Sequence, residues 1–407
     1  MKHGLSYIFR RFAASIFLLL LISPAKAANI IIGGDYTDLG TIVVVSPKLG
    51  DTATANGTAL LNTLAGITTA SETQPYLIKL GPGTYDLGAF GLQMKQYVSV
   101  EGSGEKATKI TSAPISDALP PTIATVLGVN DAELRSLTVE NTSAGTNTIG
   151  ILNLSSSPSL SHLTIIASGG MRNYGIYNSS SSPTMKDVTV TATGWGGPSS
   201  ANAVYNTSSS PIMIHVNAVA SGGSTNDGIL NDSSSSPTMT NVTVSASGGT
   251  GLNYGIVNTY SSSPTMTNVT ANASGVPGST NYGIVNSLAS SSPAMTNVIA
   301  TASGDSSVNC GIVNTSSAAP TMTNVTATAS GASSNNCGMS TSASSGNYTI
   351  LIDRCSFIGS TNSILLNDSH YTLKIGASKL DGPISGAMFS CVGSYNGSYI
   401  ALNASCL

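Results

Sequence analysis

Few side chains in the middle of this sequence could carry out acid–base chemistry. Asp227 and Asp232 lie five residues apart, but the residues expected beside them in space are uncharged. A glycosidase needs two carboxyl groups that are held a few Å apart. The spacing therefore predicts no catalytic constellation, and the catalytic residues are left unassigned. The charged residues between positions 147 and 346 are Asp187, Asp227, Asp232, Asp305, Arg172 and Lys186.

The three histidines beyond residue 100 are isolated in the sequence. We expect His162, His215 and His370 to be exposed or satisfied by hydrogen bonds rather than to act as metal ligands or bases. The sequence contains no P-loop, no dinucleotide-binding fingerprint and no zinc-ligand spacing. It therefore predicts no metal and no cofactor.

The composition excludes several classes of protein. Hydrophobic residues make up 41% of the 407 residues and charged residues only 8%, against about 25% charged in a typical soluble domain. A charge-solvated disordered chain does not have this composition. The 15 Lys and Arg residues form no basic patch, so a nucleic-acid partner is not expected. Most of the charged residues precede residue 147, where we expect an ordinary solvated surface.

The first 27 residues predict a secretory signal peptide. Basic residues precede an apolar run over 12–22, which is too short to span a membrane, and Ala25-Lys26-Ala27 is a small-x-small cleavage site. Cleavage after Ala27 would remove four basic residues and no acid, which changes the net charge from −3 to −7. We expect an exported chain without a membrane span, and the choice between periplasm and cell exterior stays open.

A repeat dominates residues 147–346. One copy is NYGIVNTYSSSPTMTNVTANASG (253–275), and the next is NYGIVNSLASSSPAMTNVIATASG (281–304). Successive copies are offset by 25 to 28 residues. The segments are rich in β-branched residues, Ser, Thr and Gly, and they lack the 3.6-residue period of helical repeats. In the copy from Asn253, the alternation places Tyr254, Ile256 and Asn258 on one face, and Gly255 and Val257 on the other.

The repeat predicts a stack of three-sided coils. Each copy contains about three short strands that are separated by corners, one of them at Pro264. Three strands per coil, stacked at ~4.8 Å, form a right-handed parallel β-helix. Identical residues then form columns, which explains the scarcity of charge, because stacked like charges repel. The predicted inward columns are Ile151, Ile176, Val204, Ile229, Ile256, Ile284 and Ile312; Met185, Met213, Met239, Met266, Met295 and Met322; and Leu163, Val188, Val216, Val242, Val269, Val298 and Val325.

These repeats resemble those of bacterial right-handed β-helix proteins of the pectin-lyase-like superfamily. The run N-x-G-I-x-N-x-S-S-S-P-T-M-T-N-V-T carries the resemblance, together with a preceding amphipathic segment at 56–67 that would cap the open end. The resemblance implies a signal peptide (1–27), an N-terminal segment with a capping helix (28–75), a parallel β-helix (76–387) and a C-terminal cap (388–407). It implies the fold but no single activity.

Two columns of polar residues mark corners of the coils. Stacked Asn side chains can form an amide ladder along the axis, so we expect a structural role for both columns. The inward column is Asn178, Asn206, Asn231, Asn258, Asn286 and Asn314. The column at the next corner is Asp187, His215, Asn241, Asn268, Asn297 and Asn324.

An outward stripe is a candidate ligand-contact surface. If Ile256 points inward, Leu152, Tyr177, Tyr205, Leu230, Val257, Val285 and Val313 point outward. Tyr177 and Tyr205 would stack on adjacent coils and offer flat aromatic surfaces to sugar rings. Alternatively, these residues simply favour parallel strands, or a C-terminal segment covers them.

The five cysteines suggest two disulfides. Cys310 and Cys337 occupy equivalent positions one coil apart, and Cys391 and Cys406 flank the C-terminal segment. Both pairs are candidates for disulfides in an oxidising compartment. Cys355 takes the column position of Val325 and is expected to be a buried free thiol.

Three hypotheses about function follow. The first is a secreted or cell-surface β-helix with a binding or structural role that contacts polysaccharide. The second is a carbohydrate-active enzyme on acidic glycans, such as a pectate lyase, hydrolase or esterase, with calcium expected only for a lyase. The third is an adhesin or tailspike-like fibre, which would favour a trimer.

Overall fold

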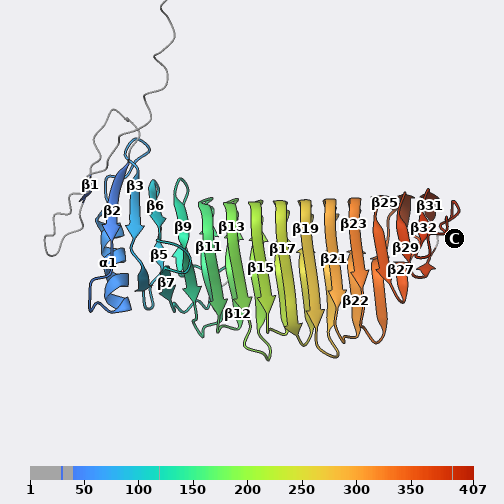
Figure 1. Ribbon diagram of the computed structural model, residues 1–407, viewed down its shortest axis with the longest axis horizontal. Helices are drawn as coiled ribbons and strands as arrows, with labels where there is room; N and C mark the ends of the chain where they lie inside the picture. The colour runs from blue at the N-terminus through green and yellow to red at the C-terminus, as the bar shows by residue number, and fades with distance from the viewer. Residues whose placement is uncertain (1–28, 31–39, 119, 387) are drawn as a thin grey trace, which may run out of the picture.

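The chain forms a rod of stacked coils (Figure 1). The computed structural model describes residues 29–30, 40–118, 120–386 and 388–407, so the predicted signal peptide lies outside the described residues. One helix, α1 (Ala53–Gly66), lies at the N-terminal end of the rod, and the other described elements are strands. Among the described helices, none is both long and apolar enough to cross a membrane.

The strands form two sheets. The larger sheet contains β1 (Asn29–Ile30), β2 (Thr41–Val45), β3 (Tyr76–Leu80), β4 (Gly83–Asp86), β6 (Val98–Glu101), β7 (Thr108–Ser112), β9 (Glu133–Asn141), β11 (Ser159–Ser168), β13 (Thr184–Thr193), β15 (Ile212–Ser221), β17 (Thr238–Gly249), β19 (Thr265–Gly275), β21 (Ala294–Ser303), β23 (Thr321–Ala329), β25 (Tyr348–Asp353), β26 (Ser356–Gly359), β28 (Tyr371–Gly376), β29 (Lys379–Asp381), β31 (Phe389–Val392) and β32 (Tyr395–Asn396). The smaller sheet contains β5 (Leu92–Gln93), β8 (Val126–Leu127), β10 (Asn147–Leu154), β12 (Arg172–Ser179), β14 (Ser200–Thr207), β16 (Thr225–Asp232), β18 (Leu252–Asn258), β20 (Thr280–Asn286), β22 (Val308–Thr315), β24 (Asn335–Ser342), β27 (Asn362–Leu366) and β30 (Ile384–Ser385).

Helix α1 covers the N-terminal end of the core. Thr52 caps it, because the Thr52 Oγ1 accepts a hydrogen bond of 3.1 Å from the Ala55 N–H. Leu60 and Leu64 are buried against the first coils. Gly57 allows a close approach, since a Cβ at this position would lie 2.0 Å from the Asp86 carbonyl oxygen. The predicted capping helix over 56–67 is thus present and begins three residues earlier.

A regular coil contains two strands rather than the three that we expected. In the coil from Leu252, the second and third predicted strands run together as β19. The strand turns its corner at Asn268, which has φ 54°. Asn tolerates this left-handed conformation better than most residues do. The pairing with β17 and β21 skips Asn268 itself and resumes at Val269, so the strand continues beyond the corner.

The predicted inward columns are present. The registers pair Ile229 with Ile256 and Ile256 with Ile284, and they pair Met239 with Met266 and Met266 with Met295. These side chains are almost fully buried and belong to one core that runs the length of the rod. The stacking of like residues at a spacing of about 27 residues therefore builds the interior, as the repeat predicts.

From β10 to β24 the strands of the smaller sheet bend at a glycine, except in β14, where Ala203 takes this place, and the bend corrects the predicted alternation. Tyr254 does not share the inward face of Ile256, because it packs with Val257 and Cys310 on the outside. Gly175, at the equivalent position of an earlier coil, faces the core, where a Cβ would lie 2.2 Å from Val190 Cγ1. The bend places two successive residues inward, and so the period of two fails at this point.

Amide ladders follow the axis, with Nδ2 of each Asn donating to Oδ1 of the next. In the column from Asn153 to Asn314 these hydrogen bonds measure 2.7 to 2.9 Å, and the side chains are fully buried. A second buried ladder, which the sequence analysis missed, joins Asn226, Asn253, Asn281 and Asn309. Exposed residues at the other corner form a third ladder, from Asn324 to Asn241.

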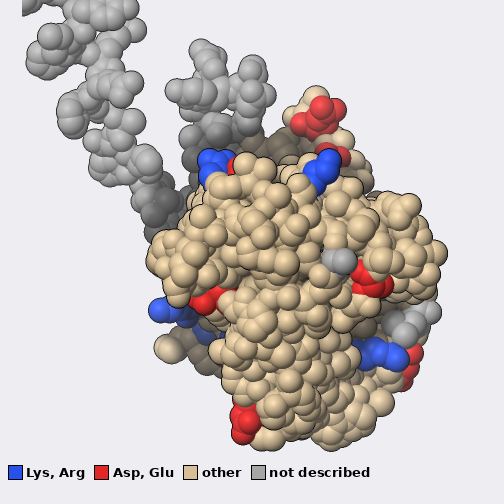
Figure 2. Space-filling view, turned by 90° about the vertical axis from the view of Figure 1, so that its right-hand side faces the viewer, with Lys and Arg blue, Asp and Glu red and all other residues tan. Residues whose placement is uncertain are grey.

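The structure contains the two candidate disulfides. Cys310 and Cys337 join adjacent coils, with their Cα atoms 4.6 Å apart, and Cys391 of β31 is bonded to Cys406, which follows the last strand, with a Cα separation of 5.3 Å. Cys355 is a buried free thiol whose Sγ accepts a hydrogen bond of 3.4 Å from the Val325 N–H. The view onto the C-terminal end shows a mostly uncharged surface with scattered charged side chains (Figure 2).

Candidate functional site

Three tyrosines form a cluster on the outward face of the smaller sheet. Tyr177 and Tyr205 are in register on adjacent strands, and their ring centroids lie 4.8 Å apart at an interplanar angle of 71°. Tyr174 lies 5.2 Å from Tyr177 and 5.8 Å from Tyr205. We call Tyr174, Tyr177 and Tyr205 the tyrosine cluster. It packs a third tyrosine, Tyr174, against the two predicted contact residues.

The outward orientation of Tyr174 was not predicted, because the strand bends at the glycine that follows it. With strict alternation, Tyr174 would share the inward face of Ile176, but the bend at Gly175 turns it outward. Burial raises the pKa of Tyr174 to about 12, so this hydroxyl stays protonated at physiological pH. The recurring N-x-G triplet was the sequence signal that could have located the bend.

One end of the outward stripe is covered. Ala124, Ile149 and Leu152 pack against the tyrosine cluster from the N-terminal side. Toward the C-terminus the stripe continues as Leu230, Val257, Val285 and Val313, beside Tyr254, Tyr282 and the Cys310–Cys337 disulfide. Among the described residues, neither apolar group includes the C-terminal segment that we considered as a cover.

Asp232 lies beside the tyrosine cluster and is held by hydroxyl groups. Its carboxylate accepts hydrogen bonds from Tyr205 (3.3 Å), Ser233 (3.1 Å) and Thr259 (2.9 Å). Burial, and then the negative charge of Asp232, raise the pKa of the Tyr205 hydroxyl. These donors fix the position of the Asp232 carboxylate at the edge of the tyrosine cluster.

Asp227 lies in the same outward column as Tyr174 and is almost completely buried. It is in register with Asn202 on one side and Tyr254 on the other, and it is 8% exposed. Its Oδ1 has no hydrogen-bond partner among the described residues, and neither has Oδ1 of Asn202, which is 5% exposed. Burial raises the pKa of Asp227 to about 7. Two unpartnered buried acceptors therefore lie side by side on this face.

The two carboxyl groups of β16 are too far apart for a paired-carboxylate glycosidase. Asp227 and Asp232 are five residues apart on one strand. At ~3.3 Å per residue this separates their backbones by ~16 Å, whereas such enzymes hold their carboxyl groups at ~5–10 Å. Arg172 is exposed at the start of β12. The face thus offers single carboxyl groups beside aromatic rings rather than a carboxyl pair.

The histidines are less isolated than we predicted. His162 Nε2 lies 3.5 Å from Asp187 Oδ2, and His215 Nδ1 lies 3.1 Å from Asp187 Oδ1. The three side chains meet because they occupy the same corner of three successive coils, each with φ between 50° and 54°. No group of three or more His, Cys, Asp and Glu side chains in the described part of the chain could hold a metal ion.

The charged residues of the first coils form ion pairs rather than a site. Arg135 pairs with Glu101 at 2.7 Å and with Glu133, and Lys79 lies 3.3 Å from Glu101. Two acids and two bases balance each other on neighbouring strands. Their mutual pairing supports a structural role.

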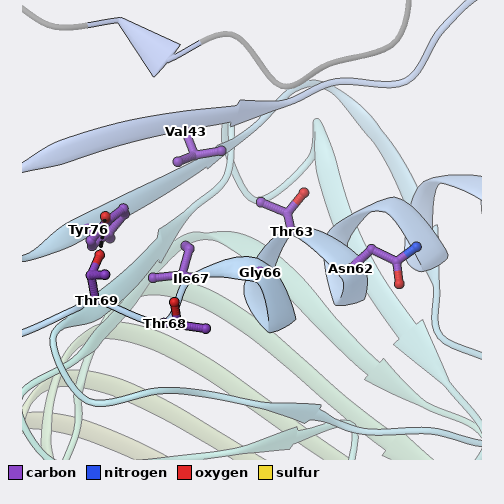
Figure 3. A pocket seen from close by; sticks show the side chains of 8 residues that line it. All are labelled: Val43, Asn62, Thr63, Gly66, Ile67, Thr68, Thr69 and Tyr76. Carbon is purple, nitrogen blue, oxygen red and sulfur yellow. Dashed lines mark hydrogen bonds between the residues drawn. The ribbon is translucent and has the colours of Figure 1, made fainter.

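A small pocket lies where α1 ends (Figure 3). It has a volume of about 360 Å³, and Thr69 Oγ1 lies 2.7 Å from the Tyr76 hydroxyl at its wall. Its lining contains no acid, histidine, cysteine or basic residue. None of the predicted contact residues lines it.

Comparisons with known proteins address the fold. No family model matches the sequence, and no curated protein matches it. Among solved structures, the A-module of mannuronan C-5 epimerase AlgE6 from Azotobacter vinelandii has a TM-score of 0.51 and 12% identity, over 84% of this chain and 95% of that module. The fold is a right-handed parallel β-helix. At this identity the similarity shows the fold alone.

Two further similarities are weaker. The A-module of AlgE4 from the same organism has a TM-score of 0.47 and 13% identity, over 86% of this chain and 88% of that module. The enzymatically active domain of tailspike protein 2 from bacteriophage CBA120 has a TM-score of 0.44 and 13% identity, over 80% of this chain and 45% of that protein.

Proposed function

We propose that this chain is an exported β-helix that binds polysaccharide through the outward face of the smaller sheet. The observation that carries the proposal is the tyrosine cluster, in which three packed rings lie beside the fixed carboxylate of Asp232. Aromatic faces flanked by hydrogen-bonding groups suit sugars, which have apolar ring faces and polar edges. The predicted signal peptide and the two disulfides support export.

Affinity electrophoresis of the mature protein in gels that contain one polysaccharide each tests this proposal. Retardation in at least one gel is expected, and Tyr205→Ala should abolish it by removing a central ring of the tyrosine cluster. Tyr260→Ala is the matched control, because Tyr260 is an exposed tyrosine on the turn that follows β18, outside the tyrosine cluster. Equal mobility of all three proteins in every gel would refute the proposal.

A second candidate function is that of a carbohydrate-active enzyme with Asp227 as a proton donor. The raised pKa of Asp227, to about 7, favours this candidate, because an acid that stays protonated near neutral pH can protonate a leaving group. A product-release screen on neutral and acidic polysaccharides, with and without calcium, tests it. Activity that Asp227→Asn abolishes would support the enzyme. Activity that survives Asp227→Asn would assign the chemistry to other residues.

A further inference from the structure

Two buried acceptor atoms on the outward face, Oδ1 of Asn202 and Oδ1 of Asp227, receive no hydrogen bond from the described residues. The two residues are in register on β14 and β16, and adjacent strands lie ~4.8 Å apart. Oδ1 of each is buried and has no hydrogen-bond partner among the described residues. An unpartnered buried polar atom costs about 1–3 kcal/mol. A ligand that supplies donors at this position would remove that cost.

The Asp227 carboxyl group lies on the outward face of the rod but is largely buried there, since the residue is 8% exposed. Its side chain projects from the outward face, where Tyr174 and Tyr254 occupy the same column. The rings of Tyr174 and Tyr254 flank the acceptor pair and would contact the faces of a sugar seated there.

The charges on this face disfavour an anionic ligand. Asp227 and Asp232 lie on β16, and the hydroxyl groups of Tyr174 on β12, Tyr205 on β14 and Tyr254 on β18 are neutral at physiological pH. Arg172 is the basic residue of this sheet between residues 147 and 342. A polyuronate would therefore meet two carboxyl groups and one guanidinium, and like charges brought together at a site repel.

We propose that this face selects neutral polysaccharide over polyuronate, an inference that rests on the proposed function. In this arrangement Asn202 and Asp227 accept hydrogen bonds from hydroxyl groups of one sugar. Sugar hydroxyl groups can donate a hydrogen bond to each of the two acceptors without bringing a negative charge to the site. This assignment departs from the acidic glycans that the superfamily resemblance suggests.

Titration calorimetry with defined fragments tests this selectivity. The probes are neutral glucan, xylan and mannan fragments, compared with oligogalacturonate, at pH 8 and low salt, where most of Asp227 is ionised and charge effects are largest. At least one neutral fragment should bind about tenfold or more tightly than oligogalacturonate. Tighter binding of oligogalacturonate would overturn the selectivity while leaving the proposed function standing. Binding of neither class would overturn both.

Two variants locate the effect. Asp227→Asn removes the charge with little change in shape, so it should weaken binding of the neutral fragment and strengthen that of oligogalacturonate. Asp305→Asn removes one negative charge from an exposed corner and is the matched control, with both affinities unchanged. If both variants shift the two affinities equally, overall charge governs selectivity and the local assignment is wrong. Circular dichroism melts confirm that each variant is folded.

Discussion

Asn178 donates a hydrogen bond of 2.8 Å from Nδ2 to Oδ1 of Asn206 in the next coil. Both side chains are completely buried. Each internal member of this ladder donates to one neighbour and accepts from the other, which satisfies amides that would otherwise be costly to bury. The ladder therefore permits a polar column inside an apolar core.

Removal of one ladder member should destabilise the protein more than removal of an exposed one. Asn258→Ala leaves Nδ2 of Asn231 and Oδ1 of Asn286 unpartnered, at an expected cost of about 2–4 kcal/mol. Asn268→Gly, which breaks the exposed ladder but keeps the left-handed corner accessible, should cost less than about 1 kcal/mol. Urea unfolding measures both, and equal losses would argue against a special role for the buried ladder.

Asp227 should make stability depend on pH. Its pKa is raised from 3.8 to about 7 on folding, so the unfolded chain loses the proton first as pH rises. The contribution of Asp227 to the free energy of unfolding is therefore complete below pH 4. It falls by roughly 4 kcal/mol as the pH rises toward 7. Asp227→Asn should remove this part of the dependence, whereas Asp305→Asn should follow the wild type. Urea unfolding between pH 4.5 and 8 measures it, and parallel curves for all three proteins would contradict the burial of the charge.

A methyl group added at Gly175 should be destabilising in its own coil, although Ala203 takes the equivalent place in β14. In Gly175→Ala the new Cβ would lie 2.2 Å from Val190 Cγ1 and 2.7 Å from the Ala203 carbonyl oxygen. We expect a loss of about 1–3 kcal/mol and a displaced Tyr174, detectable as altered tyrosine circular dichroism. Gly66→Ala is the control, because a Cβ added at Gly66 would meet no other side chain or neighbouring segment within 4 Å. Thermal melts compare the two variants, and similar melting temperatures would contradict the predicted clash at Gly175.

The disulfide between adjacent coils should be stabilising. Cys310→Ala with Cys337→Ala opens a loop with a sequence separation of 27 residues, which should cost about 3 kcal/mol. Thiol titration of the denatured, unreduced wild type should find one free thiol per chain, that of Cys355. Three free thiols in the wild type would show that one of the pairs does not form.

The inward columns of core residues were predictable from the repeat, whereas the bend within the strands of the smaller sheet was not. Equal spacing placed Ile229, Ile256 and Ile284 in register without any knowledge of the corners. The alternation rule failed at Gly255, because the strand bends there and lets two successive positions face the core, as Ala203 and Val204 also do in β14. The repeat did predict a corner at Asn268, but it did not predict that one strand would continue through that corner.

The candidate site was only partly predictable. The register placed Tyr177 beside Tyr205. Strict alternation along the strand, however, would place Tyr174 on the inward face, whereas it packs against Tyr177 on the outward face. The burial of Asp227 could not be predicted, because this position is on the outward face. Its burial depends on how the rings of the neighbouring coils pack around it. Such lateral packing is set by side-chain conformations that a repeat pattern does not contain.

The disulfide between Cys310 and Cys337 also has a mechanical consequence. Backbone hydrogen bonds between coils run along the rod, so tension applied to its ends loads every coil interface in series. The interface between β22 and β24 is bridged by a covalent bond. Under such tension the oxidised rod should separate at another interface, and reduction should make this one as breakable as its neighbours.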